Sequence, residues 1–171
     1  DRAHLQKISR IVDMLHDDFG MAAMITAGPN CMGNDVAAQY TFEDRPFFKT
    51  ELRLNPGDPK ELARLIDFRR RLVKEYFSRV EGFVVIDSDP GGYIGSTNAE
   101  FAKLLWAHLD MLGNEAPQMT LYYWMWQGWE RYNRYWQWAQ ATNTSGLPER
   151  DDWAEVLAEL VKQPGRRWAV M

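Results

Sequence analysis

The sequence predicts an α/β domain in which helices alternate with parallel strands. Short, continuous apolar segments bounded by turn residues recur along the chain, which is typical of strands buried on both faces of a parallel sheet. Between them lie longer segments whose apolar residues recur every three or four positions, as on one face of a helix. The order is helix, strand, helix, strand, helix, strand, one or two helices and a last strand. This alternation indicates right-handed crossover connections.

Four strands and at least four helices follow from this periodicity. We expect strands over residues 21–27, 82–87, 118–124 and 167–171, and helices over 3–18, 58–80, 97–113 and 152–162, with a further helix over 129–141. Asp58 is the expected N-cap of the second helix, with Pro59 at its first position and Glu61 at its third. Gly20 and Gly113 are the expected stops of the first and third helices. We expect residues 31–57 to form an irregular loop.

Two details concern the helix faces. One face of the third helix consists of Phe101, Leu104, Leu105, His108, Leu109 and Leu112. We expect His108 there to be a buried core histidine. The basic run Arg69-Arg70-Arg71 predicts a solvated helix face on which one side chain lays its stem along apolar surface.

Composition excludes several classes of protein. The 171 residues carry a net charge of −4, so no basic surplus is available for binding nucleic acid. No apolar run approaches the roughly 20 residues that cross a bilayer. The single cysteine, Cys31, excludes an internal disulfide and a cysteine-built zinc site. No His-x-x-x-His pair or His/Cys cluster occurs, so we expect no metal and no cofactor.

Two architectures fit the predicted element order. One is part of a (β/α)8 barrel, which typically needs about 250 residues, so this chain would supply about half. The other is an open doubly wound sheet. The chain starts directly in a helical pattern and ends inside a predicted strand. We therefore expect residues 1–171 to form a single domain that is a fragment of a larger (β/α)8 catalytic domain, with the remainder of that barrel as its partner.

Unusual residues gather after the predicted strands. Gly28-Pro29-Asn30 follows the first, residues 87–92 follow the second, and residues 124–129 follow the third. The connections at the other ends of the strands are short or plain. Both parallel architectures bind ligands at the carboxyl edge of the sheet, so this asymmetry predicts the site there.

Alternation along each strand suggests which of these side chains meet. Three sets each share one face: Met24, Thr26 and Asn30; Phe83, Val85, Asp87 and Asp89; Tyr122, Trp124 and Trp126. If all three are inward faces, two carboxylates, an amide and two indoles meet at one mouth.

Acids and indoles at this edge point to carbohydrate chemistry. Asp87 and Asp89, roughly 7 Å apart along a strand, would form the carboxylate pair that glycoside hydrolysis needs. The alternative is a turn whose aspartates serve Asx hydrogen bonds. Trp124, Trp126 and Trp129 would stack on sugar rings, with core packing as the alternative. Asn30 and Tyr93 are further candidates for contacts with substrate.

Other motifs are weaker. Gly91-Gly92-x-x-Gly95 follows a strand but lacks the spacing and the Lys-Ser/Thr ending of a phosphate loop. No Gly-x-Ser-x-Gly elbow occurs. Cys31 has no obvious histidine to activate it.

A family resemblance adds to these expectations. The segment Leu54-Asn55-Pro56-Gly57-Asp58-Pro59, the helix with Arg69-Arg70 and the segment 83–92 resemble bacterial barrel proteins related to α-glucuronidases and β-hexosaminidases, over about residues 20–130. The resemblance implies a (β/α)8 barrel, carbohydrate substrates, catalysis by Asp87 and Asp89, and a periplasmic or extracellular location. The Asp-Glu pair that many hexosaminidases carry at a strand end is absent.

Three functions therefore remain open. The first is a carbohydrate-active enzyme that hydrolyses glycosidic bonds. The second is a non-catalytic glycan-binding or scaffold barrel, which would keep the aromatic residues for affinity alone. The third is a flavodoxin-like domain that binds a phosphate-bearing ligand at Gly91-Gly92.

Overall fold

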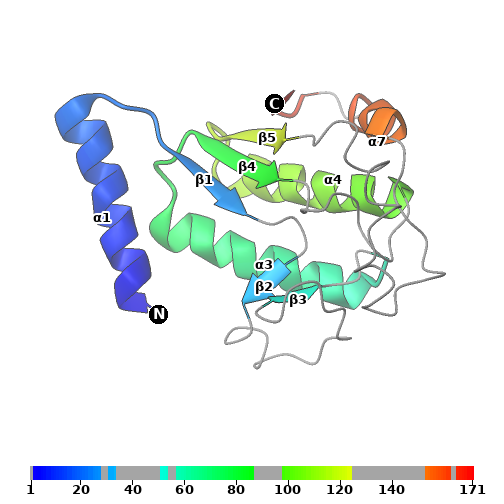
Figure 1. Cartoon of the computed structure of the whole chain (residues 1–171), viewed down its shortest axis with the longest axis horizontal. Coiled ribbons are helices and arrows are strands. Elements are labelled where there is room, and N and C mark those ends of the chain that lie inside the picture. Colours follow the sequence, from blue (N-terminus) through cyan, green and yellow to red (C-terminus); the bar gives the residue numbers. More distant parts are fainter. Residues whose placement is uncertain are drawn as a thin grey trace, which may run out of the picture.

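The computed structural model describes residues 2–27, 31–33, 51–53, 57–86, 98–124, 153–162 and 165–171. Helices in these ranges are α1 (Arg2–Phe19), α3 (Pro59–Tyr76), α4 (Asn98–Glu115) and α7 (Trp153–Leu160). Strands are β1 (Met24–Ala27), β2 (Cys31–Gly33), β3 (Glu51–Arg53), β4 (Gly82–Ile86), β5 (Thr120–Trp124) and β6 (Trp168–Val170). Figure 1 shows their arrangement. The predicted alternation of helices and strands is confirmed.

The main sheet contains four strands in the order β1-β4-β5-β6, which is their order along the chain. Every neighbouring pair is parallel. Each crossover therefore moves one strand further in the same direction, and the described sheet contains no reversal of strand order. The predicted parallel α/β class is confirmed at this level.

Helices α3 and α4 lie on the same face of this sheet (Figure 1). The Arg69 guanidinium of α3 lies 5.7 Å from the centre of the Phe83 ring in β4. From α4, His108 contacts Phe83 and Phe101 contacts Tyr123 of β5, with ring centres 5.8 and 5.5 Å apart. We call this the covered face. Strand register assigns to it Ile25, Ala27, Phe83, Val85, Leu121, Tyr123, Trp168 and Val170.

The opposite side of the sheet is called the open face here. By the same register and alternation it consists of Met24, Thr26, Gly82, Val84, Thr120, Tyr122, Trp124 and Ala169. Three of these side chains, Met24, Thr26 and Trp124, are exposed. Val84 in the middle of the sheet is buried.

The core lies between the covered face and the helices. All six residues of the predicted apolar face of α4, His108 included, are buried, so that prediction is confirmed. The prediction for the basic run is wrong at Arg69, which is only 4% exposed. Arg70 and Arg71 remain on the surface, where they pair with Asp67. The three arginines differ because successive helical positions point 100° apart, which turns Arg69 toward the sheet.

Local signals place two helix ends correctly. Asp58 caps α3, since its Oδ1 accepts the Lys60 amide at 2.8 Å. Gly20 ends α1 in the left-handed region at φ 61°, and its amide donates to the His16 carbonyl at 3.2 Å. This is the cap that glycine makes without strain. Both predicted boundaries are confirmed.

Three predictions about chain segments are wrong. Helix α3 was predicted to continue to residue 80 but ends at Tyr76. Helix α4 does not stop at Gly113 but continues to Glu115. Gly113 has a packing role instead, because a Cβ there would lie 2.5 Å from Arg166 Nη1. The segment 31–57 was expected to be irregular, yet it contains β2 and β3, which pair as an antiparallel ribbon with Cys31 opposite Arg53. Three-residue strands are too short to produce a periodic signal.

Candidate functional site

The open face carries two aromatic side chains at its carboxyl half. Trp124 is the last residue of β5 and is 40% exposed. Tyr122, two residues earlier on the same face, is partly buried. Since the carboxyl edge of a parallel sheet is where ligands bind, we take Tyr122 and Trp124, the open-face aromatic pair, as the centre of the candidate site.

A glycine lets side chains close over the beginning of β4. A Cβ added to Gly82 would lie 2.8 Å from Cγ of Met24 and 3.0 Å from Cε2 of Tyr122. Met24 from β1 and Tyr122 from β5 therefore both lie over Gly82 on the open face. Tyr122 thus lies at the base of the aromatic pair, and Trp124, the last residue of β5, lies toward the carboxyl edge.

The predicted meeting of three residue sets on one face is correct for the described members of two of them. Met24 and Thr26 do share a face with Tyr122 and Trp124. The expectation is wrong for Phe83 and Val85, which lie on the covered face. The reason is the register, which pairs Val84 with Tyr122, because a one-residue offset between neighbouring strands exchanges their faces.

Most predicted site residues cannot be placed. Asn30, Asp87, Asp89, Tyr93, Trp126 and Trp129 lie outside the described residues, as do Gly91, Gly92 and the predicted helix over 129–141. Trp124 is the predicted site residue that the structure describes. Asp87 and Asp89 were predicted to share a face with Trp124 by alternation from Phe83 and Val85. Because Phe83 and Val85 lie on the covered face, alternation does not support that prediction.

A buried histidine, His108 of α4, packs against the covered face. His108 is fully buried, and its Nδ1 donates to the Leu104 carbonyl at 2.7 Å. Burial, helped by the charge of Arg69, lowers the pKa of His108 to about 3. Within the part of the chain that the structure describes, His108 Nε2 has no hydrogen-bond partner. His108 is therefore neutral near pH 7 and belongs to the core.

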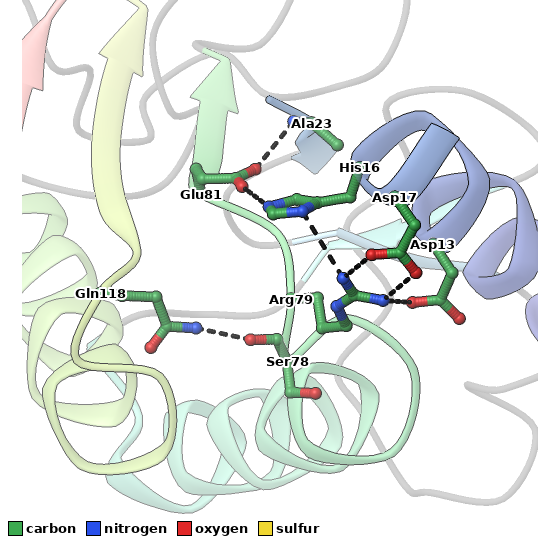
Figure 2. Close-up of polar contacts among 8 residues, drawn as sticks. All are labelled: Asp13, His16, Asp17, Ala23, Ser78, Arg79, Glu81 and Gln118. Carbon is green, nitrogen blue, oxygen red and sulfur yellow. Dashed lines mark hydrogen bonds and ion pairs between the residues drawn. The ribbon is translucent and has the colours of Figure 1, made fainter. Parts of the chain in front are cut away.

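A charged cluster lies at the amino edge of the sheet (Figure 2). Asp13, His16 and Asp17 come from α1, while Arg79 and Glu81 come from the segment between α3 and β4. We call these five residues the amino-edge cluster. Arg79 donates to Asp13 at 3.0 Å and binds both carboxylate oxygens of Asp17. His16 Nε2 lies 2.6 Å from Glu81 Oε1.

The amino-edge cluster ties α1 to the sheet. Glu81 Oε2 also accepts the amide of Ala23, immediately before β1, at 2.8 Å. Burial opposes ionisation of Glu81, but the hydrogen bonds from Ala23 and His16 outweigh it and lower the pKa of Glu81. The hydrogen bond from Arg79 lowers the pKa of Asp17. The cluster lies at the edge opposite the strands' carboxyl ends, so its role is structural. Sequence reasoning missed it because its members are far apart along the chain.

No group of three or more His, Cys, Asp and Glu side chains among the described residues is arranged to hold a metal ion. Among the same residues, no helix combines the length and apolar character needed to cross a membrane.

Comparisons with known proteins add no family assignment. No protein-family model matches the chain, and no curated protein matches it in sequence.

Proposed function

We propose that the chain forms part of a (β/α)8 barrel that binds carbohydrate and hydrolyses glycosidic bonds at the carboxyl edge of the sheet. The observation that carries the proposal is the open-face aromatic pair, Tyr122 and Trp124, at the carboxyl end of β5. Flat aromatic rings with a polar edge suit the apolar faces and hydroxyl groups of sugar rings.

The strand order supports the barrel part of this proposal. Four parallel strands follow one another without reversal, and α3 and α4 both lie on the covered face. In a barrel, consecutive strands pair in sequence and all helices lie outside. The open face would then be the barrel interior, and Trp124 would lie at its mouth. A doubly wound sheet binds ligands where its strand order reverses, so the described order disfavours the flavodoxin-like alternative.

The catalytic part assigns roles to residues that follow the strands in the sequence. Asp87 and Asp89 would work as a pair, in which one protonated acid serves the leaving oxygen and the other carboxylate attacks or activates water. Trp124, Trp126 and Trp129 would provide stacking surfaces, and Asn30 and Tyr93 would hydrogen-bond sugar hydroxyls. The resemblance to barrel glycosidases supports this assignment.

Calorimetric titration with neutral and uronic-acid oligosaccharides tests the binding part. We expect Trp124→Ala to weaken the best ligand about tenfold, which corresponds to the roughly 1.4 kcal/mol of one aromatic contact. Trp168→Phe is the matched control, since Trp168 lies on the covered face, and its affinity should equal that of the original chain. Unchanged affinity in Trp124→Ala would rule out Trp124 as a stacking surface for the sugar.

Hydrolysis of aryl glycosides and uronide oligomers tests the catalytic part. Asp87→Asn and Asp89→Asn should each lower turnover at least a hundredfold while leaving the calorimetric affinity within about twofold. Full turnover in both variants would remove these roles. Affinity without any turnover in the unaltered protein would favour the second candidate, a non-catalytic glycan-binding barrel, which the same aromatic pair also supports.

A further inference from the structure

A pocket opens between α1 and the C-terminal end of α3, two helices that lie side by side there (Figure 1). Its volume is about 610 Å³, which falls within the range of roughly 300–1,000 Å³ that small-molecule sites occupy. Four residues of α1 and two from the last turn of α3 line it: Arg2, Gln6, Ser9, Arg10, Glu75 and Tyr76. Every one of these side chains can form hydrogen bonds, so the pocket suits a polar ligand.

The α1 wall of this pocket is one stripe of the helix. Arg2, Gln6, Ser9 and Arg10 follow one another at spacings that place them on the same side of α1. Arg10 folds back along this stripe, because its Nε donates to the Gln6 carbonyl at 3.4 Å. Its guanidinium is thereby directed toward the turn that carries Gln6, on the side of Arg2.

The charges in the pocket are not neutralised within the described part of the chain. No ion pair there involves Arg2, Arg10 or Glu75. Further along α1 the acidic residues do have a basic partner, since Asp13 and Asp17 both bind Arg79. The α1 wall thus carries two positive charges and the α3 wall one negative charge, and all three are available to a ligand.

Both walls are anchored outside the pocket. Beyond Arg10, the amino-edge cluster links α1 to the segment before β4 (Figure 2), and His16 of this cluster lies 2.6 Å from Glu81. On the α3 wall, Tyr76 packs against the hydrophobic core. Because the two helices are already held, a ligand would not have to order them on binding, which favours affinity.

We propose that this pocket binds a small dipolar molecule, with a phosphate or carboxylate group at Arg2 and Arg10 and an amino group at Glu75. Guanidinium groups bind both kinds of oxyanion through paired hydrogen bonds, and a carboxylate attracts an ammonium group. The amide and hydroxyl groups of the lining would hydrogen-bond the atoms between the two ends. None of the lining residues belongs to the open-face aromatic pair, so the inference does not depend on the proposed function.

Calorimetric titration of the purified chain tests the proposal with two matched pairs of probes. Phosphoethanolamine and ethyl phosphate share a phosphate group, but only the first carries an amino group. The pair γ-aminobutyrate and butyrate makes the same comparison for a carboxylate. At least one dipolar probe should bind with a dissociation constant of about 1 mM or below, and its counterpart without the amino group should bind about tenfold more weakly.

The stronger of the two dipolar probes identifies the oxyanion. Absence of binding by both of them at concentrations up to about 10 mM would overturn the proposal. Equal affinities within each matched pair would overturn the assignment of an amino group to Glu75.

Charge variants assign the two ends of the ligand. Arg2→Gln and Arg10→Gln should each weaken binding of the dipolar probe about tenfold, because each removes charge-assisted hydrogen bonds. Glu75→Gln should abolish the difference between probes with and without the amino group. Unchanged affinity in both arginine variants, or a preference for the amino group that persists in Glu75→Gln, would contradict the proposed site.

A control variant and a folding measurement complete the experiment. Lys7→Gln removes an exposed positive charge from α1 outside the pocket lining, and the affinity should stay within about twofold. A loss as large as that in Arg10→Gln would mean that the net charge of α1, and not the pocket, attracts the probe. Circular dichroism of each variant should show the helical content of the unaltered chain, since all the substituted side chains are exposed.

Discussion

Adjacent residues of β5 lie on opposite faces of the sheet and differ in their exposure to water. Tyr123 is fully buried on the covered face, with its ring 5.5 Å from that of Phe101. Trp124, the next residue, lies on the open face and is 40% exposed. Stability therefore depends mostly on the covered face, whereas the open face leaves the Trp124 indole partly in contact with water.

The largest expected effect comes from this adjacent pair. Tyr123→Ala should lower the free energy of unfolding by about 3–5 kcal/mol, the usual cost of removing a buried aromatic ring. Trp124→Ala should cost about 1 kcal/mol or less, because much of the indole already contacts water. Urea unfolding of both variants gives the comparison. Equal costs would contradict the distinction between the faces.

The burial of His108 on the covered face predicts that the free energy of unfolding depends on pH. The folded protein keeps His108 neutral, with its pKa lowered to about 3, whereas a histidine in the unfolded chain takes up a proton near pH 6.5. Its contribution to stability is therefore complete above about pH 6.5 and declines as the pH falls toward 3. From pH 7 to pH 5, unfolding free energy should fall by about 2 kcal/mol from this group.

Two variants isolate that contribution. His108→Leu removes the titrating ring from the core and should flatten the dependence between pH 7 and pH 5. His4→Gln alters an exposed histidine of α1 and should leave the pH dependence unchanged. A slope that persists in His108→Leu would show that another group produces the pH dependence.

These effects also mark how far the sequence could predict the structure. The apolar stripe of α4 identified all six of its buried residues, because a helix has one period and one core face. The four strands of the main sheet were found because a continuous apolar segment between turn residues is typical of a buried strand. Their relative faces could not be found, since Phe83, Val84 and Val85 are all buried and carry no alternation. Only the register with β5 places Val85 and Trp124 on opposite faces.

Contacts between distant segments were equally hidden. Arg69 was predicted on a solvated face because its neighbours are arginines, and only the position of Phe83 explains its burial. The amino-edge cluster joins residues more than 60 positions apart. Of the candidate site, the sequence predicted Trp124 at a strand end, but it could not predict that Met24 and Tyr122 would both lie over Gly82.

The close packing of Met24 over Gly82 on the open face gives the third prediction. Gly82→Ala places a methyl group 2.8 Å from Met24 Cγ. Overpacking costs about 1–3 kcal/mol, and the reduced entropy of the unfolded chain returns up to about 1 kcal/mol. A net loss of about 1 kcal/mol is expected in urea unfolding. Met24→Ala in the same chain should recover most of it, and strict additivity of the two changes would contradict the contact.

The smallest expected effect lies at the amino edge, where exposure weakens the ion pairs. Because the pKa of Glu81 is lowered in the folded protein, its contribution is present above about pH 4.3, the usual value in an unfolded chain, and disappears as the pH falls through the folded value. The Glu81 side chain is 37% exposed, so Glu81→Gln should cost less than about 1 kcal/mol at pH 7.

The cost of Glu81→Gln should also vanish at low pH, where the carboxyl is protonated in both folded and unfolded chains. Part of it should be lost in molar salt, which screens the partly exposed His16–Glu81 pair, while the hydrogen bond that Glu81 accepts from the Ala23 amide persists. Glu75→Gln on the exposed side of α3 is the matched control and should change nothing. A cost of several kcal/mol would mean that α1 is held chiefly by this cluster.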